Sequence, residues 1–260
     1  MITAVILTYN EEKHIKRCIE SLIPVVDKIC ILDSFSTDKT LEIASKYQIV
    51  EFKKNSFLNY ATQFNTALDV FDIETDWVFR IDADETIDSQ CSNWLKFELQ
   101  NVQQSITGIY LNRYMTFLGK TMTYGGMSTY WALRIWRNGY GRCEQRWMDE
   151  HILLSTGDTI YAPGKLIDDN LNNLSWWSHK HVDYSTREAI DILLKESLDN
   201  KLQIRSDFFG SSSERIRYLK SIYNAVPLFV RPFLYFFYRY ILKAGFLDGR
   251  EGFLWCLLQG

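Results

Sequence analysis

The sequence lacks the features that define several protein classes. Its 260 residues include no CxxC pair and no G-x-G-x-x-G, which argues against a zinc ribbon and a dinucleotide oxidoreductase. The cysteines are few, odd in number and scattered: Cys18, Cys30, Cys91, Cys143 and Cys256. They indicate reduced thiols in a cytosolic protein and not a disulfide framework. No run reaches the roughly 20 apolar residues that a membrane-spanning helix needs.

The sequence also lacks a large excess of either positive or negative charge. The formal net charge is −3, so the basic excess of a general nucleic-acid binder is missing. The hydrophobic fraction of 47% indicates a globular protein, long enough for one large domain or a domain with an appendage. The N-terminal run "ITAVIL" has no basic residues before it and meets acid at Glu11, which predicts a strand and not a signal peptide.

The first 90 residues alternate between two periodicities. Short β-branched or apolar runs predict strands at 2–9, 28–33, 49–52 and 76–82. Amphipathic stretches between them predict helices at 10–22, 36–47 and 57–70. This order predicts an α/β fold with a mostly parallel central sheet flanked by helices. Ligands of such sheets bind at the carboxyl ends of the strands, where Asp33 and Asp82 lie.

The alternation stops near residue 105. Longer strands are predicted at 108–119 and 130–137, followed by an amphipathic helix at 185–202. We therefore expect a catalytic domain at 1–205, made of a nucleotide-binding half (1–104) and an acceptor-binding half (105–205). An aromatic, basic and helical C-terminal appendage is expected at 206–260.

The stretch "RIDADE", residues 80–85, gathers three carboxylates behind an apolar strand. Because side chains alternate along a strand, Asp82 and Asp84 are expected to point the same way. Two aligned carboxylates suit a hard cation such as Mn²⁺ or Mg²⁺, which in turn suits a diphosphate. The alternative is a plain acidic loop, but the position behind the fourth strand favours the cation site.

Three segments together resemble a known family. "AVILTYNEEKHIKRCIESL", "ILDSFSTDKTLEIA" and "WVFRIDADE" are similar to the N-terminal signatures of family 2 glycosyltransferases, which are inverting enzymes of the GT-A fold. The resemblance is strong over residues 1–90 and weaker through about 190. In particular, it resembles the small bacterial members that build lipopolysaccharide core, O-antigen or capsule.

The resemblance implies roles for particular residues. The first nucleotide-contacting loop would comprise Thr8, Tyr9, Asn10 and Glu11, with Glu11 near the base or ribose. Asp33 would receive the base, with Ser34 beside it. In the D-x-D, Asp84 would bind the metal and Asp82 the ribose or a metal-bound water, with Ala83 between them in the nucleotide-binding loop. Gln63 and Asn65 would line the nucleotide pocket; their alternative is a solvated helix face.

An inverting transfer also needs a base for the acceptor hydroxyl. The candidates are Asp149 and Glu150 in "QRWMDEHI": Glu150 matches the glutamate of the family's His-Glu versions, and Asp149 matches the base of an acidic dyad. We slightly favour Asp149, and the alternative is a surface acidic turn. His181, in "SHKHVDY", is a candidate for the metal shell or the diphosphate, or is structural. Arg134 faces either the pyrophosphate or solvent.

The C-terminal tail differs in charge from the rest of the chain. Residues 214–260 hold seven Lys/Arg against three Asp/Glu, a balance of +4 that leaves −7 for the remainder. Basic residues mixed with Phe, Tyr and Leu are typical of a segment that lies in a membrane interface. The alternative is that these aromatics pack on the catalytic domain or on a second subunit of a homo-oligomer.

These patterns predict a metal-dependent hexosyltransferase, cytoplasmic and peripheral at the inner face of the membrane. It would move a hexose from a nucleotide-sugar donor, UDP-linked, to an acceptor hydroxyl of a lipid-linked surface glycan. One alternative is a sugar-nucleotide nucleotidyltransferase, but its Gly-rich basic loop is replaced by the acidic "TYNEEKH". Another is a carbohydrate-binding module that stacks sugars on Trp and Tyr, which leaves the acids unexplained.

Overall fold

The computed structural model describes residues 1–126, 129–144, 151–182, 185–186, 226–227 and 229–259. The chain divides into two compact units. Unit 1 comprises Met1–Thr123 and Met127–Leu171, and unit 2 comprises Tyr124–Gly126 and Asn172–Gly260. The boundary expected at 205/206 falls outside the described residues, so the division into 1–205 and 206–260 stays a prediction.

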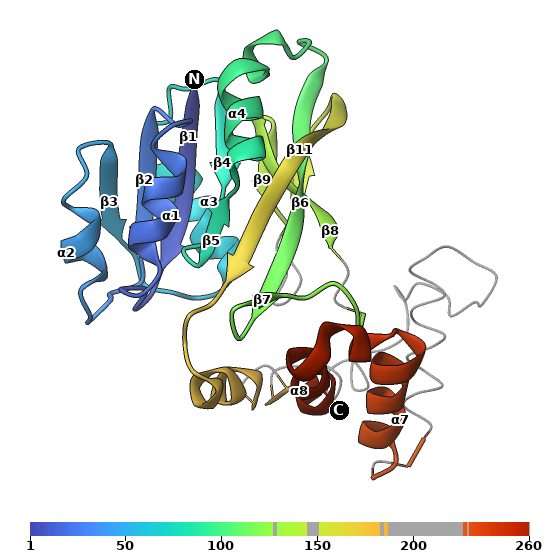
Figure 1. The fold of residues 1–260 in the computed structure, drawn as a ribbon. Coiled ribbons are helices and arrows are strands. Elements are labelled where there is room, and N and C mark those ends of the chain that lie inside the picture. Colours follow the sequence, from blue (N-terminus) through green and yellow to red (C-terminus); the bar gives the residue numbers. More distant parts are fainter. Residues whose placement is uncertain (127–128, 145–150, 183–184, 187–225, 228, 260) are drawn as a thin grey trace, which may run out of the picture. The chain divides into compact units, whose positions relative to one another are not determined.

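Unit 1 is built on a nine-stranded sheet (Figure 1). Its strands are β1 (Ile2–Thr8), β2 (Lys28–Asp33), β3 (Val50–Lys54), β4 (Trp77–Arg80), β5 (Glu85–Ile87), β6 (Ile106–Phe117), β7 (Lys120–Thr121), β8 (Tyr130–Arg137) and β11 (Asp158–Asp169). They follow the order β3-β2-β1-β4-β8-β6-β11-β5, with β7 paired to β6. A separate pair is formed by β9 (Gly141–Cys143) and β10 (Ile152–Leu154).

The predicted α/β class is confirmed, and the sheet is more mixed than the sequence indicates. Strands β3, β2, β1 and β4 are parallel, as the strand–helix alternation predicts. Strand β8 runs antiparallel to both β4 and β6. No helix separates β6 from β8 in the sequence, so that connection reverses the chain direction.

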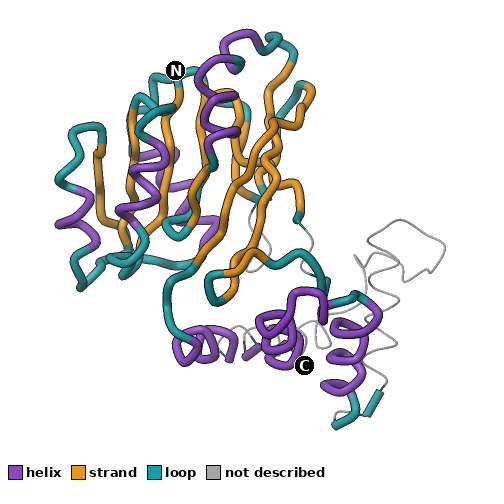
Figure 2. Tube along the Cα trace, in the orientation of Figure 1, coloured by secondary structure: helices purple, strands orange, loops and turns teal. Residues whose placement is uncertain are grey.

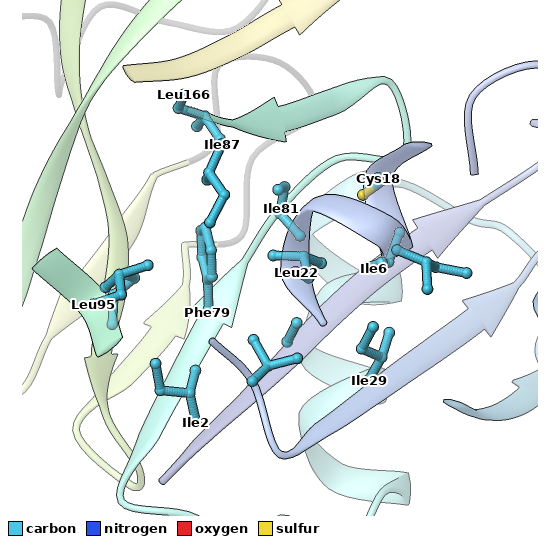
Figure 3. Packing of buried hydrophobic residues seen from close by; sticks show 14 of the residues in the cluster. Ile2, Ile6, Cys18, Leu22, Ile29, Phe79, Ile81, Ile87, Leu95 and Leu166 are labelled. Carbon is cyan, nitrogen blue, oxygen red and sulfur yellow. The ribbon is translucent and has the colours of Figure 1, made fainter. Parts of the chain in front are cut away.

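Helices cover both faces of the sheet (Figure 2). The helix α1 (Ile15–Leu22) and the helix α4 (Ser89–Phe97) bury apolar stripes against one face, and α3 (Tyr60–Val70) covers the other. Along β1, Ala4 and Ile6 join the first core while Val5 joins the second, because side chains alternate on a strand. Figure 3 shows Leu22 and Leu95 packed in the first core. All five cysteines are buried.

Helix α2 (Thr40–Ala44) is shorter than the predicted 36–47. Residues before it bond elsewhere: the Lys39 amide donates to Glu12, and Asp38 accepts from the amide and hydroxyl of Thr40. Short polar side chains of this kind compete with the helical backbone pattern. The segment 36–39 therefore joins the loops at the sheet edge.

Unit 2 contains a helix at 174–182, α7 (Arg231–Phe237), the π-helical turn η2 (Tyr238–Leu242), the 3-10 turn η3 (Gly245–Asp248) and α8 (Gly249–Gln259). Its Tyr124 amide donates to the buried Asp248 at 2.8 Å. Within the described residues, the helices are too short or too polar to cross a membrane. The helix predicted at 185–202 lies outside the described residues except for 185–186.

Candidate functional site

The carboxyl ends of β1 and β2 bring Thr8 and Asp33 side by side, since the two residues pair in the parallel register. Asp33 is fully buried, and it accepts hydrogen bonds from the Thr8 hydroxyl at 2.8 Å and from the Ser36 amide at 2.8 Å. The Ser36 hydroxyl donates a third hydrogen bond to this carboxylate at 2.5 Å. A buried carboxylate needs such partners. Asp33 therefore fixes both loops at this edge.

The loops that follow β1 and β2 are joined by further hydrogen bonds. The Asn10 amide donates to the Ser36 hydroxyl at 2.9 Å, and the Asn10 side chain accepts from the Thr37 amide at 2.8 Å. Asn10 has a left-handed φ of 57°, which asparagine tolerates. Tyr9 next to it is exposed. Phe35 also has a left-handed φ, of 62°, although it is bulky.

Glu11 binds locally as well. Its carboxylate lies 2.6 Å from Nδ1 of the buried His14, and its amide donates to the Thr40 hydroxyl at 2.7 Å. His14 Nε2 in turn accepts from the Leu171 amide at 2.9 Å. The loop predicted to contact the nucleotide and the residues that follow β11 thus share one histidine, which was not predicted from the sequence.

Two amides of α3 point to different neighbours. Gln63 is buried, and its Nε2 donates to the Ser34 hydroxyl at 3.0 Å, so these two predicted site residues lie together. Asn65 donates to the Cys143 carbonyl at 2.8 Å and accepts from its amide at 3.0 Å. Neither residue is part of a solvated helix face. Asn65 attaches α3 to β9.

The D-x-D follows β4 directly. Ala83 is buried, whereas Asp82 and Asp84 are partly exposed. Asp84 Oδ2 accepts from the Asn170 side chain at 3.0 Å. The Asp84 carbonyl accepts from Arg17 at 3.1 Å. The Asp169 amide at the end of β11 donates to the same carbonyl at 3.2 Å, so this segment holds Asp84 through both side chain and backbone.

An ionic cluster lies behind the D-x-D; we use this name for Asp82, Glu85, Arg113, Arg134 and Asp168. Arg134 Nη2 lies 2.7 Å from Glu85 Oε1 and 3.3 Å from Asp82 Oδ2. Arg113 bridges Glu85 and Asp168, at 2.6 Å each. Glu85 is fully buried, and its second oxygen accepts from the Asp82 amide at 3.0 Å. Arg134 thus faces this cluster and not the solvent.

A β-bulge explains the direction of Arg134. Ile109 pairs with Ile135 and Tyr110 pairs with Leu133, so Arg134 is an extra residue between them. Bulges of this kind turn a side chain out of the normal alternation. Strand periodicity therefore could not place Arg134 from sequence.

The cluster shifts the acidities of its members. Partial burial alone would raise the pKa of Asp82, but the cations of Arg134, Arg80 and Arg113 hold that pKa well below its usual range. For Asp168, burial and the neighbouring carboxylates raise the pKa to about 7 in spite of Arg113. Asp82 is therefore an anion at neutral pH.

Arg113, Asp168, Asp169 and Asn170 were not predicted as site residues from the sequence. Asp169 forms an ion pair with Arg17 at 2.6 Å, beside the Asn170 contact to Asp84. A signal was available in "LIDDN", residues 166–170, which repeats the pattern of acids behind an apolar strand. Its proximity to the D-x-D depends on the pairing of β11 with β5, which no local pattern reveals.

The donor atoms fit a hard cation only in part. Asp82 and Asp84 offer carboxylate oxygens, which Mg²⁺ and Mn²⁺ prefer. Within the described part of the chain, no group of three His, Cys, Asp or Glu residues could hold a metal ion. The two aspartates therefore fit a cation that also takes oxygens from a diphosphate and from water.

The structure gives less information on the predicted base residues and on His181. Asp149 and Glu150 lie outside the described residues, in the segment that connects β9 to β10. At the base of that segment, the Glu144 amide donates to the His151 carbonyl at 2.9 Å. His181 belongs to unit 2, where its ring stacks on Trp177. The base and metal roles of these residues stay predictions.

Two known proteins that are similar to this chain are both named glycosyltransferases. Residues 3–161 match the family described as "Glycosyl transferase family 2". The lipopolysaccharide core biosynthesis glycosyltransferase LpsC of Rhizobium meliloti (strain 1021) is 28% identical over 99% of this chain and 89% of its own. An uncharacterized glycosyltransferase of Rickettsia bellii is 33% identical, over 37% of this chain and 32% of its own length.

Solved structures show a weaker likeness. Staphylococcus aureus TarS 1-349 in complex with UDP is 22% identical over 46% of this chain and 37% of that chain, with a TM-score of 0.35. Glucosyl-3-phosphoglycerate synthase from Mycobacterium tuberculosis, in complex with Mn²⁺, UDP and glucosyl-3-phosphoglycerate, is 20% identical over 45% and 44%, with a TM-score of 0.35. The chain spans less than half of these crystallised proteins.

The family match covers more than half of the chain and includes β1, β2, β4 and the D-x-D. The sheet edge described above is the part of the fold where this match and the predicted site residues coincide. The chain therefore belongs to glycosyl transferase family 2, and it is a glycosyltransferase.

Proposed function

We propose that this enzyme is an inverting hexosyltransferase that uses a nucleoside diphosphate sugar, UDP-linked, and a divalent cation. The observation that carries the proposal is the D-x-D edge. There, Asp82 and Asp84 follow β4 next to the Thr8–Asp33 pair at the ends of β1 and β2. A nucleotide with a metal-bound diphosphate is the ligand that suits this set of groups.

In the proposed reaction, the acceptor oxygen bonds to the anomeric carbon while the bond from that carbon to the diphosphate oxygen breaks. The acceptor proton passes to the carboxylate of Asp149 or Glu150, and the bonding electrons leave with the nucleoside diphosphate. A cation held by Asp84 and Asp82 would stabilise that leaving charge. Arg134 and Asn170 hold the two aspartates in place.

The acceptor we propose is a hydroxyl of a lipid-linked surface glycan at the cytoplasmic face of the membrane. The similarity to LpsC, whose name places it in lipopolysaccharide core biosynthesis, supports this class of acceptor. Exposed apolar residues of unit 2 support a peripheral membrane contact: Phe229, Phe233, Leu234, Phe237, Leu242, Phe246 and Leu247. A homo-oligomer through the same residues is the alternative.

Nucleotide release from a panel of UDP-, GDP-, CMP- and dTDP-sugars, with and without Mn²⁺, tests the proposal. We expect Mn²⁺-dependent release from a UDP-sugar that falls about 100-fold or more in Asp84→Ala, because the diphosphate loses its metal ligand. The matched control is Asp72→Ala, an exposed acid before β4 and away from its carboxyl end. It should leave release unchanged.

Two results would contradict the proposal. One is the absence of nucleotide binding and release under every condition, which would favour a glycan-binding role. The other is release by the wild-type protein that is equal with and without Mn²⁺ and that a folded Asp84→Ala variant retains in full, which would remove the metal from the reaction.

A further inference from the structure

Three aromatic side chains gather on adjoining strands of the second half of the sheet. The rings of Tyr110 on β6 and Tyr161 on β11 stack with centroids 5.1 Å apart. Trp131 on β8 meets Tyr161 edge to face at 4.9 Å. Tyr161 is 61% exposed and Trp131 is 43% exposed. We call these three residues the aromatic platform.

The face of the sheet that carries the platform is fixed by alternation and by contacts. Gly108 and Tyr110 share one face of β6, opposite the buried Ile109. A side chain built on Gly108 would meet Leu154 of β10 at 2.6 Å, so the β9–β10 pair lies over this face. The connection between β9 and β10 carries Asp149 and Glu150. The platform is thus on the face that carries the β9–β10 pair.

The platform also lies on the D-x-D side of that hairpin. Gly108 is opposite Trp136, Tyr110 is opposite Leu133, and Asn112 is opposite Trp131. Moving from Gly108 to Asn112 along β6 leads toward the strand end where Arg113 contacts Glu85. Along β6, the aromatic rings therefore lie between the β9–β10 pair and the strand end that reaches the ionic cluster, on the face of the sheet opposite to Arg113.

A polar atom beside the platform lacks a partner. Asn112 Oδ1 is buried and accepts no hydrogen bond from the described residues, although its Nδ2 lies 3.5 Å from the Tyr114 hydroxyl. A buried acceptor without a donor costs about 1–3 kcal/mol. A ligand hydroxyl brought against Trp131, its cross-strand neighbour, would supply the missing donor after a small turn of the amide.

We propose that the aromatic platform is the acceptor subsite and that it binds a pyranose ring by stacking. Pyranoses present a flat C–H face, which aromatic rings contact, and a rim of hydroxyls, which Asn112 would meet. The inference rests on the proposed function, since it assigns the acceptor side of the same site. It assigns binding and positioning of the acceptor to these residues and leaves the chemistry to the hairpin.

A purely structural role predicts a different result. Cross-strand aromatic pairs stabilise sheets, so loss of a ring could lower stability alone. The fold of each variant is therefore checked by thermal unfolding, and nucleotide release in the absence of acceptor is measured on the same preparation. A structural role would alter these two readouts and would not discriminate between sugars.

The test is saturation-transfer NMR with methyl pyranosides of glucose, galactose, mannose and heptose as probes. We expect transfer to at least one probe in the wild type, and a loss of about tenfold in affinity for Trp131→Ala and Tyr161→Ala. Tyr161→Phe keeps the ring and should bind as the wild type does. Phe97→Ala removes an exposed ring from the end of α4, outside the platform, and serves as the control.

The outcomes separate this inference from the proposed function. If wild-type protein releases nucleotide with Mn²⁺ but no pyranoside shows transfer, or transfer survives in folded Trp131→Ala and Tyr161→Ala, the platform is not the acceptor subsite. If nucleotide release itself is absent, the proposed function fails. Ring-dependent pyranoside binding would still establish a sugar site on the platform in that case.

Discussion

At the scale of single residues, Phe35 is in an unfavourable conformation next to the buried Asp33. Its φ of 62° belongs to the left-handed region, which costs a bulky residue about 1–2 kcal/mol. The side chain is 53% exposed, so little core packing offsets this cost. Strain retained in a loop at the predicted nucleotide edge indicates that the ring serves the site and not the fold.

We expect Phe35→Gly to raise the free energy of unfolding by about 0.5–1 kcal/mol. The relief of strain exceeds the entropy that glycine adds to the unfolded chain, which is about 0.4–1 kcal/mol. Urea unfolding measures the change. The donor KM should rise in the same variant. A less stable protein with an unchanged donor KM would show that the ring contributes to folding alone.

Arg134 is the residue on which the ionic cluster depends. Substitution by Met keeps the volume but leaves the fully buried Glu85 with Arg113 as its remaining ion-pair partner among the described residues. Breaking a buried ion pair in this way costs about 3–5 kcal/mol, so we expect a fall of that size in urea unfolding. Arg142→Met removes an exposed pair with Asp69 and should cost under about 1 kcal/mol. Equal losses in the two variants would contradict this account.

At the scale of elements, local periodicity predicted the strands and helices whose apolar patterns span only a few residues. The strands at Asp33 and before Asp82, and the helices α1 and α3, follow from apolar patterns a few residues long. The ends of those strands also located the D-x-D. Strand β11 was missed because its run is broken at Pro163 and Gly164, where its register with β6 shifts.

The side-chain amide of Asn65 is one of the contacts that attach the β9–β10 hairpin to α3. Asn65 makes two hydrogen bonds to the Cys143 backbone, and the hairpin connection carries the candidate bases. We expect Asn65→Ala to lower kcat about tenfold or more while the donor KM changes less than about threefold, since a misplaced base slows chemistry and not binding. Steady-state kinetics on the responsive donor measures both constants.

A matched control lies one turn further along α3. Asp69 reaches the neighbouring strand residue Arg142 through an exposed ion pair, so Asp69→Ala removes a contact between the same two elements. It should change kcat less than about twofold, because exposed pairs contribute little. A similar fall in kcat for both variants would mean that any loosening of this surface affects catalysis, and that Asn65 has no particular role.

At the scale of the whole molecule, contacts between residues far apart in the sequence could not be predicted from local patterns. Arg113 contacts Glu85 across 28 residues of sequence, Arg134 contacts Asp82 across 52 and Asn170 contacts Asp84 across 86, so neither period nor spacing indicates these contacts. Asp84 was identifiable because its strand, its spacing and its family signature agree. The contacts that hold these acids in place had to come from the three-dimensional structure.

The distribution of apolar surface in unit 2 leads to the last prediction. Phe233 and Phe237 are four residues apart on one face of α7 and are 75% and 53% exposed. The exposed Lys243 and Arg250 follow nearby in the sequence. If these rings enter a membrane interface, each contributes about 1.5–3 kcal/mol, and the basic residues favour anionic lipid. The joint change of Phe233 and Phe237 to Ser should therefore reduce cosedimentation with vesicles of 30% anionic lipid by more than about tenfold.

The same measurement separates a membrane from a partner subunit. Binding should weaken as salt rises, because the basic residues are screened, and nucleotide release by the double variant should stay at the wild-type rate. The variant Phe97→Ser, in unit 1, should bind vesicles normally. The alternative outcome is that wild-type protein stays in the supernatant at every lipid composition and forms a dimer that the double substitution dissociates. The exposed rings would then form a subunit contact, and the acceptor would have to reach the enzyme without a membrane docking surface on α7.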